Sequence, residues 1–257
     1  MLEQSKINTV GLIPSRWGST RFEGKPLAMI NGVPMIKRVY DQASMSKRLD
    51  EVYVVTDDDR IENYCNDNNL NVIRIDDDVK TGTDRIALTL DTLDAKVYVN
   101  IQGDEPLIDP DAIDKLIETH TLSSVTNAYV ELSESNAGEL SFTVGKWHKL
   151  HDKNVVKVVT DSYDNALYYS RLSIPYYQKD TTPIKQQLGL YAFDKEFLKL
   201  FPTLPVRDLE RSESVEMLRF VENGYKVKMV EVNDVGLSVD TPNDIKSVEN
   251  YLNDIQH

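Results

Sequence analysis

Apolar residues follow two alternating patterns along the first half of the chain. Residues 7–13, 51–56 and 96–102 are short apolar runs (INTVGLI, EVYVVT and KVYVNIQ), and such runs predict buried strands. Between them, apolar residues recur every three or four positions, as in residues 33–46, and this spacing predicts amphipathic helices. Strands that alternate with helices across short turns predict an α/β fold, with a mostly parallel central sheet and helices on both faces.

The pattern changes after about residue 140. Residues 155–177 are rich in β-branched and aromatic residues around a polar turn (DSYDN), and they predict an antiparallel hairpin. We therefore expect a hairpin subdomain or dimerisation region over about residues 140–187. The alternation then resumes, with helices predicted over 213–224 and 241–254. Because no linker or repeat interrupts the pattern, residues 1–257 are expected to form a single domain.

Composition narrows the functional classes. The formal net charge of −13 argues against a nucleic-acid partner, because binding nucleic acid requires a basic face. The sequence contains no apolar window long enough for membrane insertion and no cationic leader before an apolar segment. The single cysteine, Cys65, cannot form an intrachain disulfide and is expected to be a small buried hydrophobe. We therefore expect a cytoplasmic enzyme.

Three cations gather on a loop after the first predicted strand. Residues 13–27 (IPSRWGSTRFEGKPL) contain Arg16, Arg21, Lys25 and two glycines, although the chain as a whole is acidic. Such a loop can hold phosphates, because arginine binds phosphate oxygens in a bidentate manner and lysine supplies a point charge. The spacing differs from that of a Walker A loop, and a solvated turn explains such a segment about as often as a phosphate site does.

Two aspartates follow other predicted strands. Asp104 comes after the apolar run 96–102, and Asp240 ends another apolar stretch before the last helix. The carboxyl ends of parallel strands meet at one edge of a sheet, where ligands bind, so we expect both aspartates beside the cationic loop. Two carboxylates there would suit Mg²⁺, which completes its shell with phosphates and water. The alternative is that these aspartates only cap turns or helices.

Two further patterns carry less weight. Residues 81–85 (TGTDR) predict a helix start, whose free N–H groups can bind a phosphate or a base, but a plain helix cap is the better explanation. The four histidines show no spacing typical of a metal site and are expected to be solvated or to support the hairpin.

Several of these segments together resemble one enzyme family, the cytidylyltransferases that activate 3-deoxy-manno-octulosonate (Kdo), or CMP-Kdo synthetases. The matching segments occur in family order between residues 13 and 245: IPSRWGSTRFEGKPL with NGVPMI, VVTDDDRI, TGTDRI, NIQGDEPLI, YYSRLSIP and VDTPNDI. Each segment alone is common, whereas the combination of the first loop, QGDEP and VDTP is specific.

The resemblance implies a nucleotidyltransferase fold, CTP as a substrate, a Mg²⁺ cofactor and a homodimer built partly on the hairpin. It implies Asp104 and Asp240 as metal ligands, and these two residues with Arg16 and Lys25 as the catalytic set. The nucleotide-binding residues that it implies are Arg16, Arg21, Lys25, Thr81, Gly82, Thr83, Arg85 and Gln102. The sugar-binding positions that it implies are Arg171, Gln187, Glu210, Glu213 and Met217.

The sugar side departs from the family pattern at two positions. Gln187 stands where members have histidine (QLGLY instead of HLGIY), and Met217 stands where they have glutamine (LERSESVEMLR instead of LExxExLEQLR). Methionine cannot donate a hydrogen bond to a sugar hydroxyl. Arg171, Glu210 and Glu213 match the pattern. We therefore expect an intact nucleotide side and an altered sugar side.

The expected reaction is transfer of CMP from CTP to a 2-keto-3-deoxy sugar acid, with release of pyrophosphate, for a bacterial surface polysaccharide (lipopolysaccharide or capsule). The altered positions lead to the hypothesis that the acceptor is a Kdo analogue such as 8-amino-Kdo, or another ulosonic acid. Ordinary Kdo in a repacked pocket is the alternative. A catalytically silent binding relative and a transferase with another nucleotide or acceptor are two further possibilities.

Overall fold

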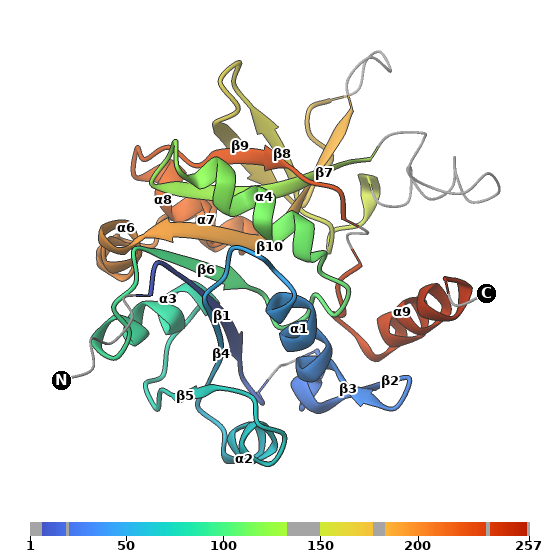
Figure 1. Cartoon of the computed structure of the whole chain (residues 1–257). Helices are drawn as coiled ribbons and strands as arrows, with labels where there is room; N and C mark the ends of the chain where they lie inside the picture. The colour runs from blue at the N-terminus through green and yellow to red at the C-terminus, as the bar shows by residue number, and fades with distance from the viewer. Residues whose placement is uncertain (1–6, 19–20, 133–149, 177–182, 235–236, 256–257) are drawn as a thin grey trace.

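A central sheet runs through the computed structural model, which describes residues 7–18, 21–132, 150–176, 183–234 and 237–255 (Figure 1). The strands lie in the order β11-β7-β10-β6-β1-β4-β5. Their bounds are β1 Thr9–Ser15, β4 Glu51–Thr56, β5 Val72–Arg74, β6 Val97–Ile101, β7 Val125–Leu132, β10 Ile184–Asp194 and β11 Lys228–Glu231. β1 pairs in parallel with β4 and β6, whereas β10 runs antiparallel to β6 and β7. The predicted mostly parallel sheet is confirmed.

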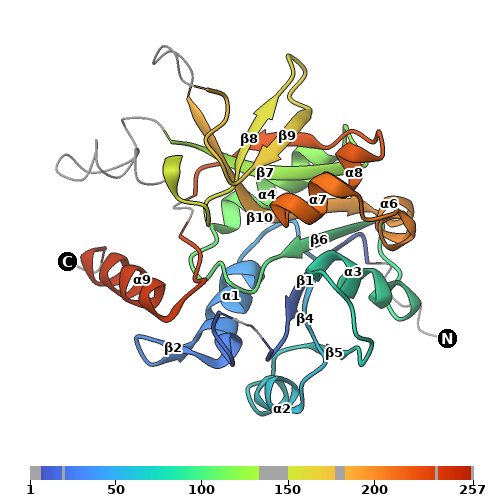
Figure 2. The same cartoon turned by 180° about the vertical axis from the view of Figure 1, so that it is seen from behind.

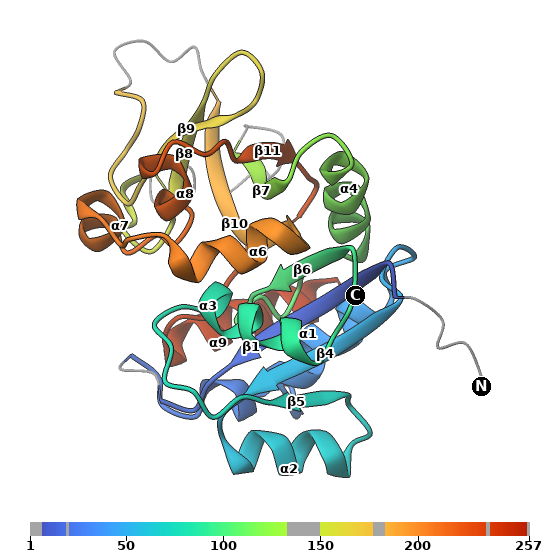
Figure 3. The ribbon, with the colours of Figure 1, turned by 90° about the vertical axis from the view of Figure 1, so that its left-hand side faces the viewer.

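The predicted hairpin is also present. β8 (Lys157–Thr160) and β9 (Ala166–Ser170) pair antiparallel around the polar turn, and β8 meets β10 where Lys157 pairs with Gln186. Figure 3 shows β8, β9 and β11 at one end of the sheet and β5 at the other. Residues 133–149 and 177–182 of the hairpin region and its approach lie outside the described residues.

Helices cover both faces of the sheet, as the alternating pattern predicts. On one face lie α1 (Met35–Ser44), α2 (Asp59–Asp67) and α4 (Pro110–His120), and Figure 1 shows α1 and α4 from that side. On the other face lie α3 (Gly82–Ala87), α6 (Lys195–Leu200), α7 (Asp208–Glu213) and α8 (Leu218–Glu222) (Figure 2). The last helix, α9 (Pro242–Asp254), packs beside the small two-stranded sheet of β2 (Met29–Ile30) and β3 (Val33–Pro34).

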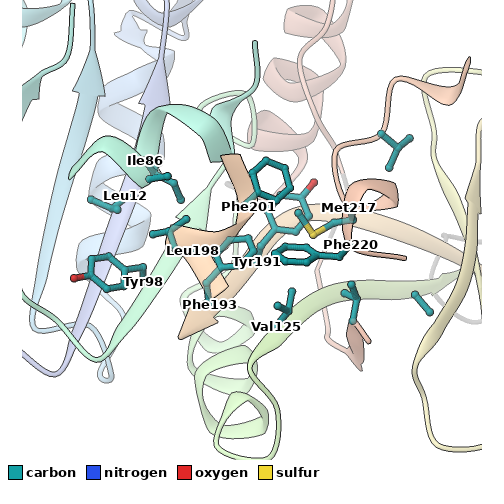
Figure 4. Close-up of a cluster of buried hydrophobic side chains, with 14 of the residues drawn as sticks. Leu12, Ile86, Tyr98, Val125, Tyr191, Phe193, Leu198, Phe201, Met217 and Phe220 are labelled. Atoms are coloured by element: carbon teal, nitrogen blue, oxygen red, sulfur yellow. The ribbon is translucent and has the colours of Figure 1, made fainter. Parts of the chain in front are cut away.

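Each face has its own apolar core. The predicted inward face of α1 is confirmed, because Met35, Ile36, Val39 and Ala43 are fully buried. Cys65 of α2 is buried as expected, and burial raises the pKa of its thiol to about 11. On the opposite face, aromatic side chains from β10 and the helices after it gather into the cluster shown in Figure 4.

Four sequence expectations need correction. Residues 237–240 form no strand, although the sequence pattern predicts a strand that ends at Asp240. β7 lies in a segment to which the pattern assigns no element. The helix expected over 213–224 is shorter: α7 ends at Glu213 and α8 begins only at Leu218, because Ser214 adopts a left-handed backbone (φ 52°) and Arg171 binds the carbonyls of Glu213 and Ser214. His120 is buried rather than solvated, with its ring nitrogens 3.1 Å from Thr126 Oγ1 and 3.2 Å from Asp194 Oδ1.

In the part of the chain that the structure describes, no helix combines the length and the apolar character that crossing a membrane requires.

Candidate active site

The cationic loop after β1 is closed by a glycine. Gly24 has a positive φ of 69°, and a Cβ atom there would lie 2.8 Å from the Trp17 ring, so glycine is required at this position. Its N–H donates to the Trp17 carbonyl oxygen (3.0 Å), and the guanidinium of Arg60 stacks over the Trp17 ring. The closed loop places Lys25 at the start of a short 3₁₀ turn, beside the carboxyl end of β6.

Lys25 joins two aspartates that are far apart in the sequence. Its Nζ atom lies 2.8 Å from Asp104 Oδ2 and 4.0 Å from Asp240 Oδ1, and it donates to the Val239 carbonyl oxygen (3.0 Å). Arg21 adds a second cation 2.8 Å from Asp240 Oδ1. The Val239 N–H also donates to the Asp104 carbonyl oxygen (2.9 Å), so the backbone itself holds the two segments together. The predicted meeting of both aspartates with the cationic loop is confirmed.

Asp240 is not the cap of the last helix. Thr241 caps α9 in a reciprocal arrangement with Asp244, whose carboxylate accepts the N–H groups of Asp240 (3.0 Å) and Thr241 (2.7 Å). The Asp240 carboxylate therefore remains available to the cavity that it lines. Burial and the nearby Asp104 charge raise its pKa, while Lys25 and Arg21 oppose this rise.

Two adjoining cavities, of about 730 Å³ and 200 Å³, share Arg16, Arg21, Gln102 and Asp104. A volume of roughly 300–1,000 Å³ is usual for a small-molecule site. We call one part of this space the loop half, formed by Arg16, Arg21, Lys25, Thr81, Gly82, Gln102, Asp104 and Asp240. The other part, the hairpin half, is formed by Asp152, Asn154, Arg171, Gln187, Glu210 and Glu216.

The start of α3 lies in the loop half. Thr81 caps the helix by accepting the Asp84 N–H (3.0 Å), and Thr81 and Gly82 also line both cavities. The helix-cap explanation is therefore correct without excluding a binding role. The carboxyl ends of β1 and β6 lie here because the two strands run parallel. The start of α3 lies at the same edge of the sheet.

Thr83 and Arg85, which the resemblance implies as nucleotide-binding residues, have buried side chains. Thr83 Oγ1 accepts from Asn100 Nδ2 (3.0 Å). Arg85 pairs with Asp57 (2.6 Å) and donates to the Ile75 carbonyl oxygen (3.0 Å), although it also borders the smaller cavity. Their contacts hold the wall of the loop half in place.

The floor between the two halves joins β6 to β10. A Cβ atom at Gly189 would lie 2.6 Å from Gln102 Cγ, so this close approach requires glycine, and the Gln102 N–H donates to the Gly189 carbonyl oxygen (2.9 Å). The buried Glu105 carboxylate accepts the Gly189 N–H (3.3 Å). Burial, with the Asp104 charge, raises the pKa of Glu105 to about 8. Gln102 Nε2 donates to Glu216 (3.1 Å), which links this floor to the segment before α8.

Glu216 connects the two halves directly. Besides the contact with Gln102, its carboxylate accepts the Thr83 N–H at the start of α3 (3.1 Å). Burial raises its pKa, and the hydrogen bonds from the α3 segment oppose that rise.

Arg171 and Gln187 both reach the hairpin half. Arg171 follows β9, and its guanidinium donates to the carbonyl oxygens of Glu213 (2.6 Å), Lys153 (2.9 Å) and Ser214 (3.2 Å). Gln187 belongs to β10 and donates to the Tyr191 hydroxyl (2.7 Å). Because β10 runs antiparallel to β6, its first residues reach the edge where β6 ends.

Glu213 supports this wall from outside the cavity lining. Its carboxylate accepts from Ser170 Oγ (2.7 Å), from the Tyr168 hydroxyl (3.1 Å) and from the Arg171 N–H (2.8 Å). These hydrogen bonds lower its pKa against the opposing effect of burial.

Two implied sugar-binding positions have other partners in the structure. Met217 is fully buried within the aromatic core of Figure 4, and the cavity lining does not include it. Glu210 does line the cavity, but its carboxylate forms a buried ion pair with Arg219 (2.7 Å). Arg219 also pairs with Asp84 (2.6 Å), so it ties α8 to the start of α3. Substitution at Met217 therefore changes the packing behind the cavity rather than a group that faces it.

Sequence reasoning missed two buried charged residues that shape the site: Lys157 and Arg219. Lys157 and Arg219 interrupt otherwise apolar stretches (VVKVVT and MLRFV), and a charge within an apolar run is the signal that points to a buried, paired group.

Comparison with known proteins gives concordant results. The sequence profile of a family described as cytidylyltransferase matches residues 10–229. The chain is 42% identical to 8-amino-3,8-dideoxy-manno-octulosonate cytidylyltransferase of Shewanella sediminis, over 96% of this chain and 99% of that protein. It is 40% identical to 3-deoxy-manno-octulosonate cytidylyltransferase of Syntrophotalea carbinolica, with the same coverage of both chains. The solved structure of CMP:2-keto-3-deoxy-manno-octonic acid synthetase complexed with CTP is 31% identical, with a TM-score of 0.85 over 96% of this chain and 99% of that one.

Proposed function

Because the chain belongs to the cytidylyltransferase family, we propose that it transfers CMP from CTP to a 2-keto-3-deoxy sugar acid. The acceptor is Kdo or a close analogue such as 8-amino-Kdo, and pyrophosphate is released. Near full-length relatives named for these activities support the proposal. The observation that carries it is the contact of Lys25 with Asp104 and Asp240, which gathers cations and carboxylates at one edge of the sheet.

In this reaction the anomeric hydroxyl oxygen of the sugar acid attacks the α-phosphorus of CTP. A new oxygen–phosphorus bond forms, the bond from the α-phosphorus to the oxygen that bridges to the β-phosphorus breaks, and pyrophosphate leaves with the electron pair. The hydroxyl proton passes to solvent, and no covalent enzyme intermediate is needed. Arg16, Arg21 and Lys25 would bind the triphosphate and stabilise the charge that develops on it.

The residues of the loop half fit a Mg²⁺ ion. The Lys25 ammonium is itself a cation that approaches both Asp104 and Asp240, so one cation can reach both carboxylates. Among the described residues, no group of three or more His, Cys, Asp or Glu side chains is placed to hold a metal. Two carboxylates suffice for Mg²⁺ when phosphates and water complete the shell. When bound, Mg²⁺ would lower the pKa of the attacking hydroxyl and neutralise phosphate charge.

The amino analogue is the acceptor that we favour. The relatives from Shewanella carry the 8-amino name, and the hairpin half bears Gln187 in place of the family's histidine. Asp152 and Glu216 line this half without an ion-pair partner among the described residues, and their carboxylates give it an acidic character that suits an ammonium group. Because Met217 lies behind the cavity, the preference would come from Gln187 and these carboxylates.

Product formation tests the proposal directly. The purified protein is incubated with Mg²⁺, each of the four nucleoside triphosphates, and either Kdo or 8-amino-Kdo, while pyrophosphate and the CMP-sugar are measured. We expect turnover with CTP and a higher kcat/KM for the amino analogue. Equal or faster turnover of Kdo would overturn the analogue preference, and a clear preference for UTP or ATP would overturn the cytidine assignment. If pyrophosphate is released with none of the acceptors, the result supports the alternative that the protein is a catalytically silent binding relative.

The assembly and setting are further parts of the proposal. We propose a homodimer, supported by the exposed Tyr163 and Leu167 side chains on the β8–β9 hairpin. Light scattering after gel filtration tests it, and a monomer at all concentrations would contradict it. Because the reaction consumes CTP, we propose a cytoplasmic setting in which the product supplies lipopolysaccharide or capsule synthesis.

A further inference from the structure

Lys157 is a buried lysine that the proposed reaction does not use. It begins β8, and its side chain is fully buried. Its Nζ atom donates to the carbonyl oxygens of Val155 (2.6 Å), Arg171 (2.7 Å) and Asp152 (2.9 Å). An ammonium group has three N–H donors, so these three acceptors satisfy it completely.

Such an ammonium is costly to bury, and the cost points to a specific role. A charge in the protein interior is strongly unfavourable unless polar partners surround it. Burial lowers the pKa of Lys157, and the nearby Asp152 charge opposes this. An apolar residue of similar length would fill the same space in the run VVKVVT without this cost. The lysine therefore maintains a local geometry that an apolar side chain would not maintain.

The three carbonyl groups belong to two walls of the hairpin half. Asp152, Asn154 and Val155 line the cavity on one side, and Arg171 lines it at the end of β9. The Arg171 guanidinium reaches back to the carbonyl of residue 153, and it also binds the carbonyls of Glu213 and Ser214 at the end of α7. Lys157 and Arg171 thus fix three chain segments around one part of the cavity.

We propose that Lys157 is a positioning residue for the acceptor. Its ammonium holds residues 152–155 against the Arg171 backbone, and this contact orients Arg171 toward the carboxylate of the sugar acid. The inference rests on the proposed function and on the family resemblance, which implies that Arg171 binds the sugar acid. The three hydrogen bonds of Lys157 all lie in the hairpin half, so its role concerns the sugar acid and not CTP.

Steady-state kinetics of Lys157→Met test this role. We expect the KM for the sugar acid to rise about tenfold or more, because the wall loses three charge-assisted hydrogen bonds. The KM and the dissociation constant for CTP should stay within about twofold, since the loop half is unchanged. A role in stability alone would lower the unfolding midpoint and leave the KM for the sugar acid at its wild-type value, and that result would overturn the proposal.

Lys185→Met is the matched control. Lys185 lies on β10 next to the residue that pairs with Lys157, but it donates to Thr160 Oγ1 (2.9 Å) and contacts the Tyr129 ring, away from the cavity lining. Both KM values should remain at the wild-type level in this variant. An equal rise in the KM for the sugar acid in both lysine variants would contradict a specific role of Lys157.

A double-mutant cycle tests whether Lys157 acts through Arg171. Arg171→Gln alone should raise the KM for the sugar acid, and adding Lys157→Met should raise it by no more than about twofold further. If the effects of the two substitutions on the KM for the sugar acid are fully additive in free energy, Lys157 does not act through Arg171. If Lys157→Met does not fold, Lys157→Gln is measured in its place, because glutamine keeps a hydrogen-bond donor. The KM for the sugar acid is again expected to rise while the KM for CTP stays unchanged.

Failure of this inference differs from failure of the proposed function. A wild-type protein that forms no CMP-sugar with any acceptor contradicts the function itself. Wild-type turnover together with an unchanged KM for the sugar acid in both Lys157 variants contradicts only the positioning role.

Discussion

The loop half and the hairpin half of the cavity satisfy their charges in different ways. In the loop half, Lys25 and Arg21 pair with Asp104 and Asp240 across segments that are partly open to the cavity. In the hairpin half, the charges are bound into the protein. Glu210 pairs with a buried arginine, and the Arg171 guanidinium binds three backbone carbonyls.

This difference separates ion pairs that a ligand can displace from charged groups that the protein's own hydrogen bonds hold in one orientation. Phosphates or a metal can exchange with the ion pairs of the loop half, because each cation and carboxylate there faces ligand space. Groups whose hydrogen bonds are already filled by backbone carbonyls present a fixed surface to a ligand. We therefore expect substitutions in the loop half to reduce turnover, and substitutions in the hairpin half to change the choice of acceptor.

The largest effect is expected for the metal-ligand position Asp104. Asp104→Asn removes one of two carboxylates and leaves Lys25 without its nearest counter-ion, so kcat should fall on the order of a thousandfold. Pyrophosphate release measures it, and EDTA should abolish the wild-type activity. Asp41→Asn, in an exposed pair on α1, is the control and should retain activity. Near-normal turnover by Asp104→Asn would remove the basis of the metal site.

The second-largest loss of turnover is expected for Lys25. Lys25→Met should lower kcat roughly a hundredfold, because a cation that stabilises phosphate charge in the transition state is worth about 3 kcal/mol. Lys37→Met provides the comparison, since Lys37 forms an exposed helix pair with Asp41. If the two lysine variants have the same kcat, the loop half is not the phosphate site.

A selectivity change is expected in the hairpin half. Gln187→His restores the family's residue, and it should lower the ratio of kcat/KM for 8-amino-Kdo over Kdo by about tenfold, because imidazole alters the hydrogen bonds offered to the acceptor. The KM for CTP should not change. An altered KM for CTP with an unaltered acceptor ratio would show that the two halves do not divide the substrates as proposed.

The smallest effect is expected for His120, the last residue of α4, which contacts Asp194 at the end of β10 away from the cavity. Burial lowers the pKa of His120 below 6.5, although Asp194 opposes this. The folded state therefore binds the proton less readily than the unfolded state, so stability is present above about pH 6.5 and is lost as pH falls through the folded-state pKa. His120→Gln should flatten the decline of the unfolding midpoint between pH 7 and pH 5, with acceptor selectivity unchanged. An equally steep decline in the variant would contradict this assignment.

The hydrophobic pattern predicted most of the parallel part of the sheet and its helices. Apolar runs and the face of α1 have a clear period, and burial follows that period. The pattern failed at Ser214, where a helical sequence is interrupted because Arg171, from a distant strand, binds the carbonyls at the break. It also missed β7, whose pairing with β10 and β11 brings together segments far apart in the chain.

The sequence by itself determined the chemistry available in the loop half. The cationic loop and Asp104 follow the parallel strands β1 and β6, which end at one edge, so their meeting could be derived before any coordinates. Asp240 lies in residues 237–240, which form no strand, and the long-range hydrogen bond from the Val239 N–H to the Asp104 carbonyl oxygen brings it to this edge. Only the tertiary structure decided which charged groups of the hairpin half stay available to a ligand. The burial of these groups, their bonds to backbone carbonyls and ion pairs such as Glu210 with Arg219 depend on contacts between separate segments of the chain. The local sequence pattern does not show which segments meet. Whether a side chain faces a cavity or a core, as Met217 does, depends on those long-range contacts.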